Sequence, residues 1–294
     1  MSGQPRHRCR DARSTASRID RRLRVPHRLP CVGGLLWLAV LFGCTRSSTV
    51  PTALPSRHSL VREQLVIESD FELPRQHRLI EELVAQRTDL AVKLALPTSD
   101  EPIVVYLFDS AERFRRFFRT HYPSLPARRA FFVESDTRLA VYAHWGDRVA
   151  EDLRHEVCHG YLHAVVPRIP LWVDEGLAEY FEVPRGLAGF NRLHVEHLAA
   201  LRRERDWKPD LQRLEALTEV AAMSQDDYAE AWAWVHWLLE SDQQSADLLR
   251  GYLDELRQRG IAAPLSLALR REFPQAGELL LAHLDRLEAQ RAGE

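Results

Sequence analysis

Short apolar runs in the first half of the chain are separated by turn-forming residues. Residues 64–68 and 102–108 (QLVIE and PIVVYLF) have the composition of strands, and the second run is typical of a buried strand. Residues 131–134 and 139–144 flank the turn-like segment 135–137, which is the pattern of a β-hairpin. The first half therefore predicts a small β-sheet.

Helical periodicity first appears between these strands and then dominates the second half. Apolar residues recur every three or four positions over residues 75–96, and Asp109-Ser110 can cap a helix that runs to about residue 121. From about residue 147 we expect helices at 148–165, 171–182, 190–204, 211–217, 226–240, 244–259, 262–272 and 276–290. The sequence thus predicts an α+β fold, in which a small mixed β-sheet is followed by a mainly α-helical half.

The first 44 residues have the organisation of a secretory signal. Nine arginines lie in residues 1–28, and the apolar run 32–42 follows them. This run ends in Leu41-Phe42-Gly43-Cys44, which is similar to a bacterial lipobox, where the cysteine thiol receives the lipid. We expect a signal peptide over 1–44 with lipidation at Cys44; an uncleaved N-terminal anchor, with Cys44 incidental, is the alternative.

A segment rich in Ser, Thr and Pro follows this signal. We expect residues 45–60 to form a tether and residues 61–294 to form the domain, with an α/β part at 61–146 and a helical part at 147–294. The domain would then be attached to a membrane of the bacterial cell envelope by the lipid or the anchor, facing the periplasm or the cell surface.

Charge and cysteine content narrow the expected function. The formal net charge is −2, but residues 1–28 carry nine Arg against Asp11 and Asp20, which leaves −9 on the rest of the chain. This acidic balance argues against a nucleic-acid partner. Cys158 is the one cysteine after residue 44, so the expected domain has no intramolecular disulfide.

Residues 155–159 form an H-E-x-x-H pattern on one of the expected helices. His155 and His159 lie one turn apart on the same helix face, so both imidazoles can reach one cation, while Glu156 lies at the flank of that face. Zinc chemistry needs this arrangement: neutral nitrogen donors, an open position for water, and a carboxylate that takes the water's proton.

A third zinc ligand can come from the helix that follows. Two prolines within residues 166–170 turn the chain back, and the next helix then brings Glu175 to face the two histidines. A metzincin site would instead need glycine at position 162 and histidine at position 165, where the chain has Leu162 and Val165. A glutamate from the following helix, as in thermolysin-like or aminopeptidase-like sites, fits better.

Residues 153–182, LRHEVCHGYLHAVVPRIPLWVDEGLAEYFE, resemble the zinc core of the gluzincins, in the peptidase MA-like group of bacterial proteins. Many members of this group are domains of unknown function. The hairpin region and residues 228–240 also resemble the group, so the similarity spans about residues 100–240. The group's pattern of H-E-x-x-H and then W-[LV]-[ND]-E-G-x-A-E-Y is matched by His155, Glu156, His159, Trp172, Glu175, Gly176, Ala178, Glu179 and Tyr180.

The resemblance implies one zinc ion (Zn2+) per chain, with His155, His159 and Glu175 as its ligands. Glu156 would be the general base that activates water and later passes the proton to the leaving amine. Glu179, one turn after Glu175, would accept a hydrogen bond from a ligand imidazole. The G-x-M-E-N stretch of the aminopeptidase branch is absent, so endopeptidase action is expected.

Several further residues have both a functional and a packing interpretation. Tyr228 is our candidate to bind the oxyanion of the transition state, with packing as the alternative, and His236 is the reserve, more often a buried core histidine. We expect Cys158 to be a small buried helix residue and His163 to lie behind the ligands. An apolar helix surface against the core is expected for Trp232, Trp234 and Trp237.

Charged residues outside the motif are expected in solvent. This applies to Glu182, after the second motif helix, and to the Arg128-Arg129 pair, because the arginine pairs of the chain are too widely spaced to form one patch.

The sequence therefore predicts a lipid-anchored, zinc-dependent peptidase of a bacterial cell envelope, acting on a peptide or protein substrate. An extended peptide could pair with the 139–144 strand as an added strand. The alternative, from a different class, is a catalytically silent envelope lipoprotein that serves as a binding scaffold.

Overall fold

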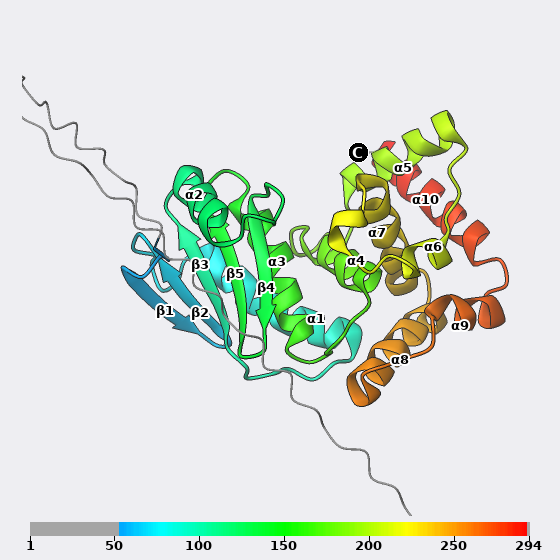
Figure 1. The fold of residues 1–294 in the computed structure, drawn as a ribbon. Helices are drawn as coiled ribbons and strands as arrows, with labels where there is room; N and C mark the ends of the chain where they lie inside the picture. Colours follow the sequence, from blue (N-terminus) through cyan, green and yellow to red (C-terminus); the bar gives the residue numbers. More distant parts are fainter. Residues whose placement is uncertain (1–52, 293–294) are drawn as a thin grey trace, which may run out of the picture. The chain divides into compact units, whose positions relative to one another are not determined.

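A computed structural model describes residues 53–292, which form a five-stranded mixed sheet followed by a helical half (Figure 1). The predicted signal peptide, Cys44 and the first half of the predicted tether lie outside the described residues. Within residues 53–292, none of the helices has the length and apolarity that a membrane crossing requires. The α+β architecture is as the hydrophobic pattern predicts.

The sheet has the strand order β1-β2-β3-β5-β4. Strands β2, β3 and β5 run parallel, while β1 and β4 are antiparallel to their neighbours. The bounds are His58–Arg62 (β1), Leu65–Ser69 (β2), Ile103–Phe108 (β3), Ala130–Ser135 (β4) and Arg138–His144 (β5).

The position of β5 corrects one prediction. We expected a peptide to pair with residues 139–144, but β5 is hydrogen-bonded to β3 on one side and to β4 on the other. The hairpin folds its first strand outward, so β4 has the free edge and is the strand that an extended peptide could join.

Alternate side chains of the central strands pack on two separate helical layers. Ile103, Val105 and Leu107 of β3 join the large core with α1 (Arg78–Leu94) and α3 (Val149–His163). Tyr106 and Phe108 point to the other face, where they pack with the phenylalanines of α2 (Ala111–His121). The near-continuous apolar run of β3 is explained by this two-sided burial.

Strand β1 corrects the boundary of the predicted tether. Residues 58–60 were expected to belong to the tether, but His58–Arg62 pairs with β2. The strand is mostly exposed at the sheet edge, so its sequence HSLVR carries no apolar run that would mark it.

The helical half contains α4 and all later elements (Figure 1). Trp232, Trp234 and Trp237 of α7 are buried, as predicted. Gly176 of α4 lies so close to α7 that an added Cβ would be 2.6 Å from the carbonyl oxygen of Ala231. The bounds are Leu171–Phe181 (α4), Arg192–Arg205 (α5), Leu211–Glu215 (α6), Val220–Ala222 (η1), Gln225–Glu240 (α7), Gln243–Arg259 (α8), Leu265–Glu272 (α9) and Ala276–Ala292 (α10).

Candidate metal centre and its cleft

Two consecutive helices bring the predicted zinc ligands together. His155 and His159 lie one turn apart on α3, and Glu175 lies in the second turn of α4, after a turn that contains Pro167 and Pro170. The Nε2 atoms of His155 and His159 are 3.5 and 3.7 Å from Oε2 of Glu175. The three predicted donors therefore converge on one point.

The donor set fits a zinc ion. Oε2 of Glu175 is buried and has no hydrogen-bond partner among the described residues. Ligand atoms of a tetrahedral zinc site, at about 2.0–2.1 Å from the metal, lie about 3.4 Å from one another, close to the two measured separations. Two imidazoles and one carboxylate also leave the fourth position open, as catalytic sites do.

Each of the two predicted ligand histidines presents its other ring nitrogen to a carboxylate. Nδ1 of His155 is 3.1 Å from Oε2 of Glu182, and Nδ1 of His159 is 2.8 Å from Oδ1 of Asp174. Such contacts hold the ring and keep Nε2 free for a metal. Burial would lower the pKa of His155, but Glu175 and Glu182 outweigh burial and raise it well above its ordinary value.

The carboxylate partner of His155 differs from the predicted one. Glu179 was expected to accept from a ligand imidazole, but its Oε2 is 2.7 Å from Nε2 of His194, on α5. Glu175, Glu179 and Glu182 share one face of α4, since they are four and three residues apart. Glu182 was expected in solvent, but its carboxylate lies against His155. The same carboxylate also accepts a hydrogen bond from Asn191.

Behind His159, a chain of alternating carboxylates and imidazoles leads to the surface. Oδ2 of Asp174 is 3.0 Å from Nε2 of His163, whose Nδ1 is 2.7 Å from Oε2 of Glu134 on β4. Burial would lower the pKa of His163, but the two carboxylates raise it to about 9. His163 therefore lies behind the ligands, as predicted, and Asp174 is a partner that the sequence analysis missed.

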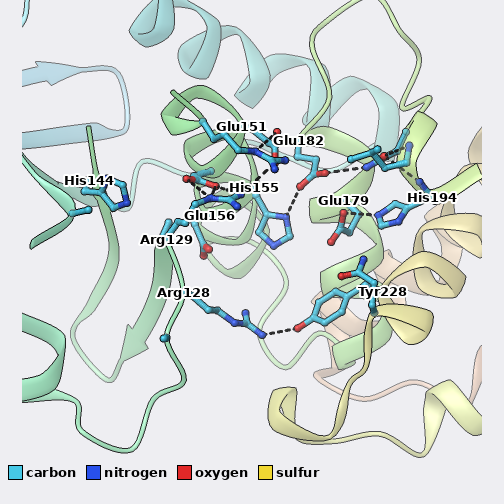
Figure 2. Close-up of a pocket in the computed structure, with 18 of the residues that line it drawn as sticks. Arg128, Arg129, His144, Glu151, His155, Glu156, Glu179, Glu182, His194 and Tyr228 are labelled. Carbon is cyan, nitrogen blue, oxygen red and sulfur yellow. Dashed lines mark hydrogen bonds and ion pairs between the residues drawn. The ribbon is translucent and has the colours of Figure 1, made fainter. Parts of the chain in front are cut away.

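Glu156 faces the cleft in front of the donors (Figure 2). Burial raises the pKa of its carboxyl, while the two ligand histidines and a backbone hydrogen bond from Phe132 lower it in part. Cys158, on the far side of the helix, is fully buried, and burial raises the pKa of its thiol well above its ordinary value. Glu156 and Cys158, two of the three residues between the histidines, thus have opposite environments, as predicted.

The cleft has a volume of about 830 Å³ and is lined from both halves of the fold. Tyr228, near the start of α7, forms part of its far wall, where a capping box of Ser224 and Asp227 begins the helix. Burial raises the pKa of its phenol, as does Glu175, so the hydroxyl remains a proton donor. Figure 2 shows Tyr228 across the cleft from Glu156, joined to Arg128 by a hydrogen bond of 2.8 Å.

His236, the reserve candidate for the oxyanion, does not line this cleft. It is buried between α7 and α10, with its Nδ1 at 2.8 Å from Nε2 of His283. His236 is therefore a buried core histidine, the interpretation that the sequence favoured over a role as oxyanion donor.

Arg128 and Arg129 are both exposed, as predicted, but each has a specific partner. Arg129 binds Asp152 with two nitrogens, at 2.7 and 2.9 Å. Arg128 reaches across the cleft to Tyr228. Neither contact has a sequence signal, because the partners are 23 and 100 residues away. His194 was missed for the same reason, whereas Asp174 could have been found beside Glu175 in the motif.

Comparison with known families gives one match. Residues 149–259 match a family described as "Protein of unknown function (DUF1570)". A search of the curated proteins finds no match to the chain. The matched residues begin with α3 and end with α8, so they contain His155, Glu156, His159, Glu175 and Tyr228.

Proposed function

We propose that this protein is a zinc-dependent peptidase of the gluzincin type, with endopeptidase action in a bacterial cell envelope and a lipid anchor at Cys44. The observation that supports it most is the buried, unpartnered Oε2 of Glu175, placed between the Nε2 atoms of two histidines at a cleft that Glu156 also faces. A buried carboxylate oxygen without a partner is costly unless a ligand such as a metal occupies the site.

Zinc held by His155, His159 and Glu175 would act as a Lewis acid toward water and the peptide carbonyl. Glu156 takes the proton of the attacking water as the new C–O bond forms, and it passes that proton to the leaving nitrogen as the C–N bond breaks. Its buried position favours both steps, because burial moves the carboxyl pKa upward, toward that of a group that exchanges protons near neutrality.

Tyr228 supplies the hydrogen bond to the developing oxyanion in this proposal. Its oxygen accepts a hydrogen bond from Arg128, which can only donate, so the phenolic proton is free to point elsewhere, into the cleft. The substrate chain lies extended along the free edge of β4, whose Phe132 also contacts Glu156.

The test begins with metal content. Residues 45–294, purified without chelators, are expected to hold about one zinc per chain by elemental mass spectrometry, and His159→Ala is expected to hold none. Circular dichroism confirms that both chains are folded. A folded wild-type chain without metal would overturn the proposal.

Hydrolysis is then measured on a peptide mixture by mass spectrometry. Glu156→Gln is expected to retain zinc and to lose about 10²–10⁴-fold in rate, the usual contribution of a general base. Tyr228→Phe is expected to lose about 10²–10³-fold, as when one oxyanion donor is removed. Undiminished hydrolysis in Glu156→Gln would contradict the mechanism, and zinc binding without any hydrolysis would favour the binding-scaffold alternative.

A further inference from the structure

Four arginines line the cleft, and they divide into two kinds. Arg129 and Arg148 are ion-paired with Asp152 and Glu151, at the start of α3. Arg115 and Arg128 have no carboxylate within ion-pair distance among residues 53–292. The cleft therefore presents two cations whose charge the described part of the protein does not neutralise.

Arg128 is the one of these two that lies at the reaction centre. Its Nη2 donates to the Tyr228 hydroxyl at 2.8 Å, and its guanidinium lies 5.9 Å from the centre of that ring. The other N–H groups of this guanidinium contact no acceptor in the described residues. A planar guanidinium held by one contact, with its remaining donors free, is suited to bind a carboxylate through two parallel hydrogen bonds.

The charges nearest to Arg128 leave it available to an anion. Burial would lower the pKa of Arg128, but Tyr228, Glu175 and Glu156 raise it, so the guanidinium lies within electrostatic range of both carboxylates. Neither carboxylate forms an ion pair with Arg128 in the described residues, and a divalent cation bound at Glu175 would offset part of their charge, so the guanidinium can attract a bound anion.

We propose that Arg128 binds a substrate carboxylate next to the scissile bond, so that this site selects acidic peptides. The inference rests on the proposed peptidase function and adds a substrate class to it. With endopeptidase action the carboxylate comes from an Asp or Glu side chain; a C-terminal carboxylate at this place would make the enzyme a carboxypeptidase instead. Arg115 lines the same cleft and adds positive charge to it.

The test measures binding and hydrolysis separately. The probes are peptides Ac-Ala-Ala-Ala-Ala-Ala in which each position in turn is Glu or Gln, with either a free or an amidated C-terminus. Dissociation constants are measured by calorimetry on zinc-loaded Glu156→Gln, which cannot turn the peptides over, and kcat/KM is measured on the wild type.

Acidic members are expected to bind at least about tenfold more tightly than their neutral counterparts, because a charge-assisted bidentate contact is among the strong hydrogen bonds. A preference for Glu over Gln at one position identifies a side-chain carboxylate; a preference for the free C-terminus identifies the terminal one. Adding Arg128→Gln should reduce either preference to less than about twofold, and Arg128→Lys should retain part of it, since lysine keeps the charge but not the planar fork.

Arg119→Gln is the matched control, because Arg119 is an exposed arginine of α2 that does not line the cleft. It removes the same charge and should keep the full preference. Equal binding of acidic and neutral peptides, no detectable binding of either, or an equal effect of Arg119→Gln would overturn the proposal. If the wild type hydrolyses acidic and neutral peptides equally well, the carboxylate proposal is overturned and the peptidase proposal is kept. If acidic peptides bind selectively through Arg128 but no peptide is hydrolysed, the carboxylate site is supported and the peptidase proposal is overturned.

Discussion

Two groups of buried histidines lie in neighbouring parts of this protein, and the charges around them have opposite signs. His155, His159 and His163 follow one face of α3, where every ring has a carboxylate within 3.1 Å. His236 and His283 join α7 to α10, and their neighbours include the cations Lys93 and Arg286.

The second group forms a chain of neutral hydrogen bonds. Arg286 can only donate, so Nδ1 of His283 accepts from it and Nε2 of His283 carries the proton that is donated to Nδ1 of His236. Burial lowers the pKa of His236 to about 3 and that of His283 to about 4, and the nearby cations act in the same direction. This pair is held in the neutral form.

Burial is therefore shared by both groups and does not distinguish a metal site from a packed core. The carboxylates distinguish them, because they orient the rings of α3 and would balance the charge of the proposed cation, whereas the charged group that contacts the α7–α10 pair in the described residues is the cation Arg286. Four experiments can sharpen or break this distinction.

The largest difference is expected in metal binding. His159→Ala should abolish zinc binding, because two donors are too few to hold the ion at a catalytic site. His236→Ala should leave zinc stoichiometry unchanged, although it opens a cavity in the core. Elemental analysis of both variants after dialysis measures this. If both variants lost zinc equally, the α3 histidines could not be distinguished from the His236–His283 pair as the metal site.

Removal of the carboxylates that orient the rings is expected to weaken metal binding without abolishing it. Asp174→Asn or Glu182→Gln should raise the zinc dissociation constant about 10–100-fold, the usual effect at such positions. Competition with a chromophoric chelator gives the constant. Glu179→Gln is the control on the same helix face, since Glu179 bonds to His194 and not to a predicted ligand. If Glu179→Gln raised the zinc dissociation constant as much, Glu179 would have its predicted role as the hydrogen-bond acceptor of a ligand imidazole.

Gly176 tests the contact between α4, which carries Glu175, and α7, which carries His236. Gly176→Ala would place a methyl group 2.6 Å from the carbonyl oxygen of Ala231, which forces α4 and α7 apart. We expect a loss of about 1–3 kcal/mol in the free energy of unfolding, measured by urea titration. Gly251→Ala, where an added Cβ meets nothing within 4 Å, is the control within a helix and should not destabilise.

The last effects are expected in the pH dependence of stability of the metal-free protein. The pKa values of His236 and His283 are depressed, so the unfolded chain binds more protons than the folded chain below about pH 6.5. Their contribution is present above that pH and falls by up to about 1.4 kcal/mol per pH unit for each histidine as the pH drops toward 4.

The α3 group should show the reverse. The pKa of His163 is raised to about 9, so its contribution is present below about pH 6.5 and is lost as the pH rises through 9. Urea unfolding from pH 4 to 10 measures both slopes. His283→Asn should flatten the acidic slope and His163→Gln the alkaline slope; a variant that changes the wrong slope would contradict the assigned pKa directions.

Local patterns explain which features the sequence could predict. The H-E-x-x-H spacing and the prolines after α3 determine where His155, His159 and Glu175 lie, because all three donors fall within 21 consecutive residues. Tyr228 was placed at the cleft only through resemblance. Glu182 was misplaced in solvent, and the contact of the exposed Arg128 with Tyr228 was missed, since these partners depend on how α4 ends and how the segment before β4 crosses the cleft. Strand β1 was missed because an exposed edge strand needs no apolar periodicity.

The close contact at Gly176 also fixes α4 and α7, which carry two of the cleft's functional groups, relative to each other. Glu175 directly precedes this glycine and Tyr228 lies three residues before Ala231, so both groups are attached to backbones that already touch. The opposite side is residues 122–129, which contain neither helix nor strand and end at Arg128 and Arg129. In mechanical terms, α4 and α7 move as one unit at this contact, so the distance between Glu175 and Tyr228 stays fixed, and this segment is held to the rest of the cleft through Arg128 and Arg129.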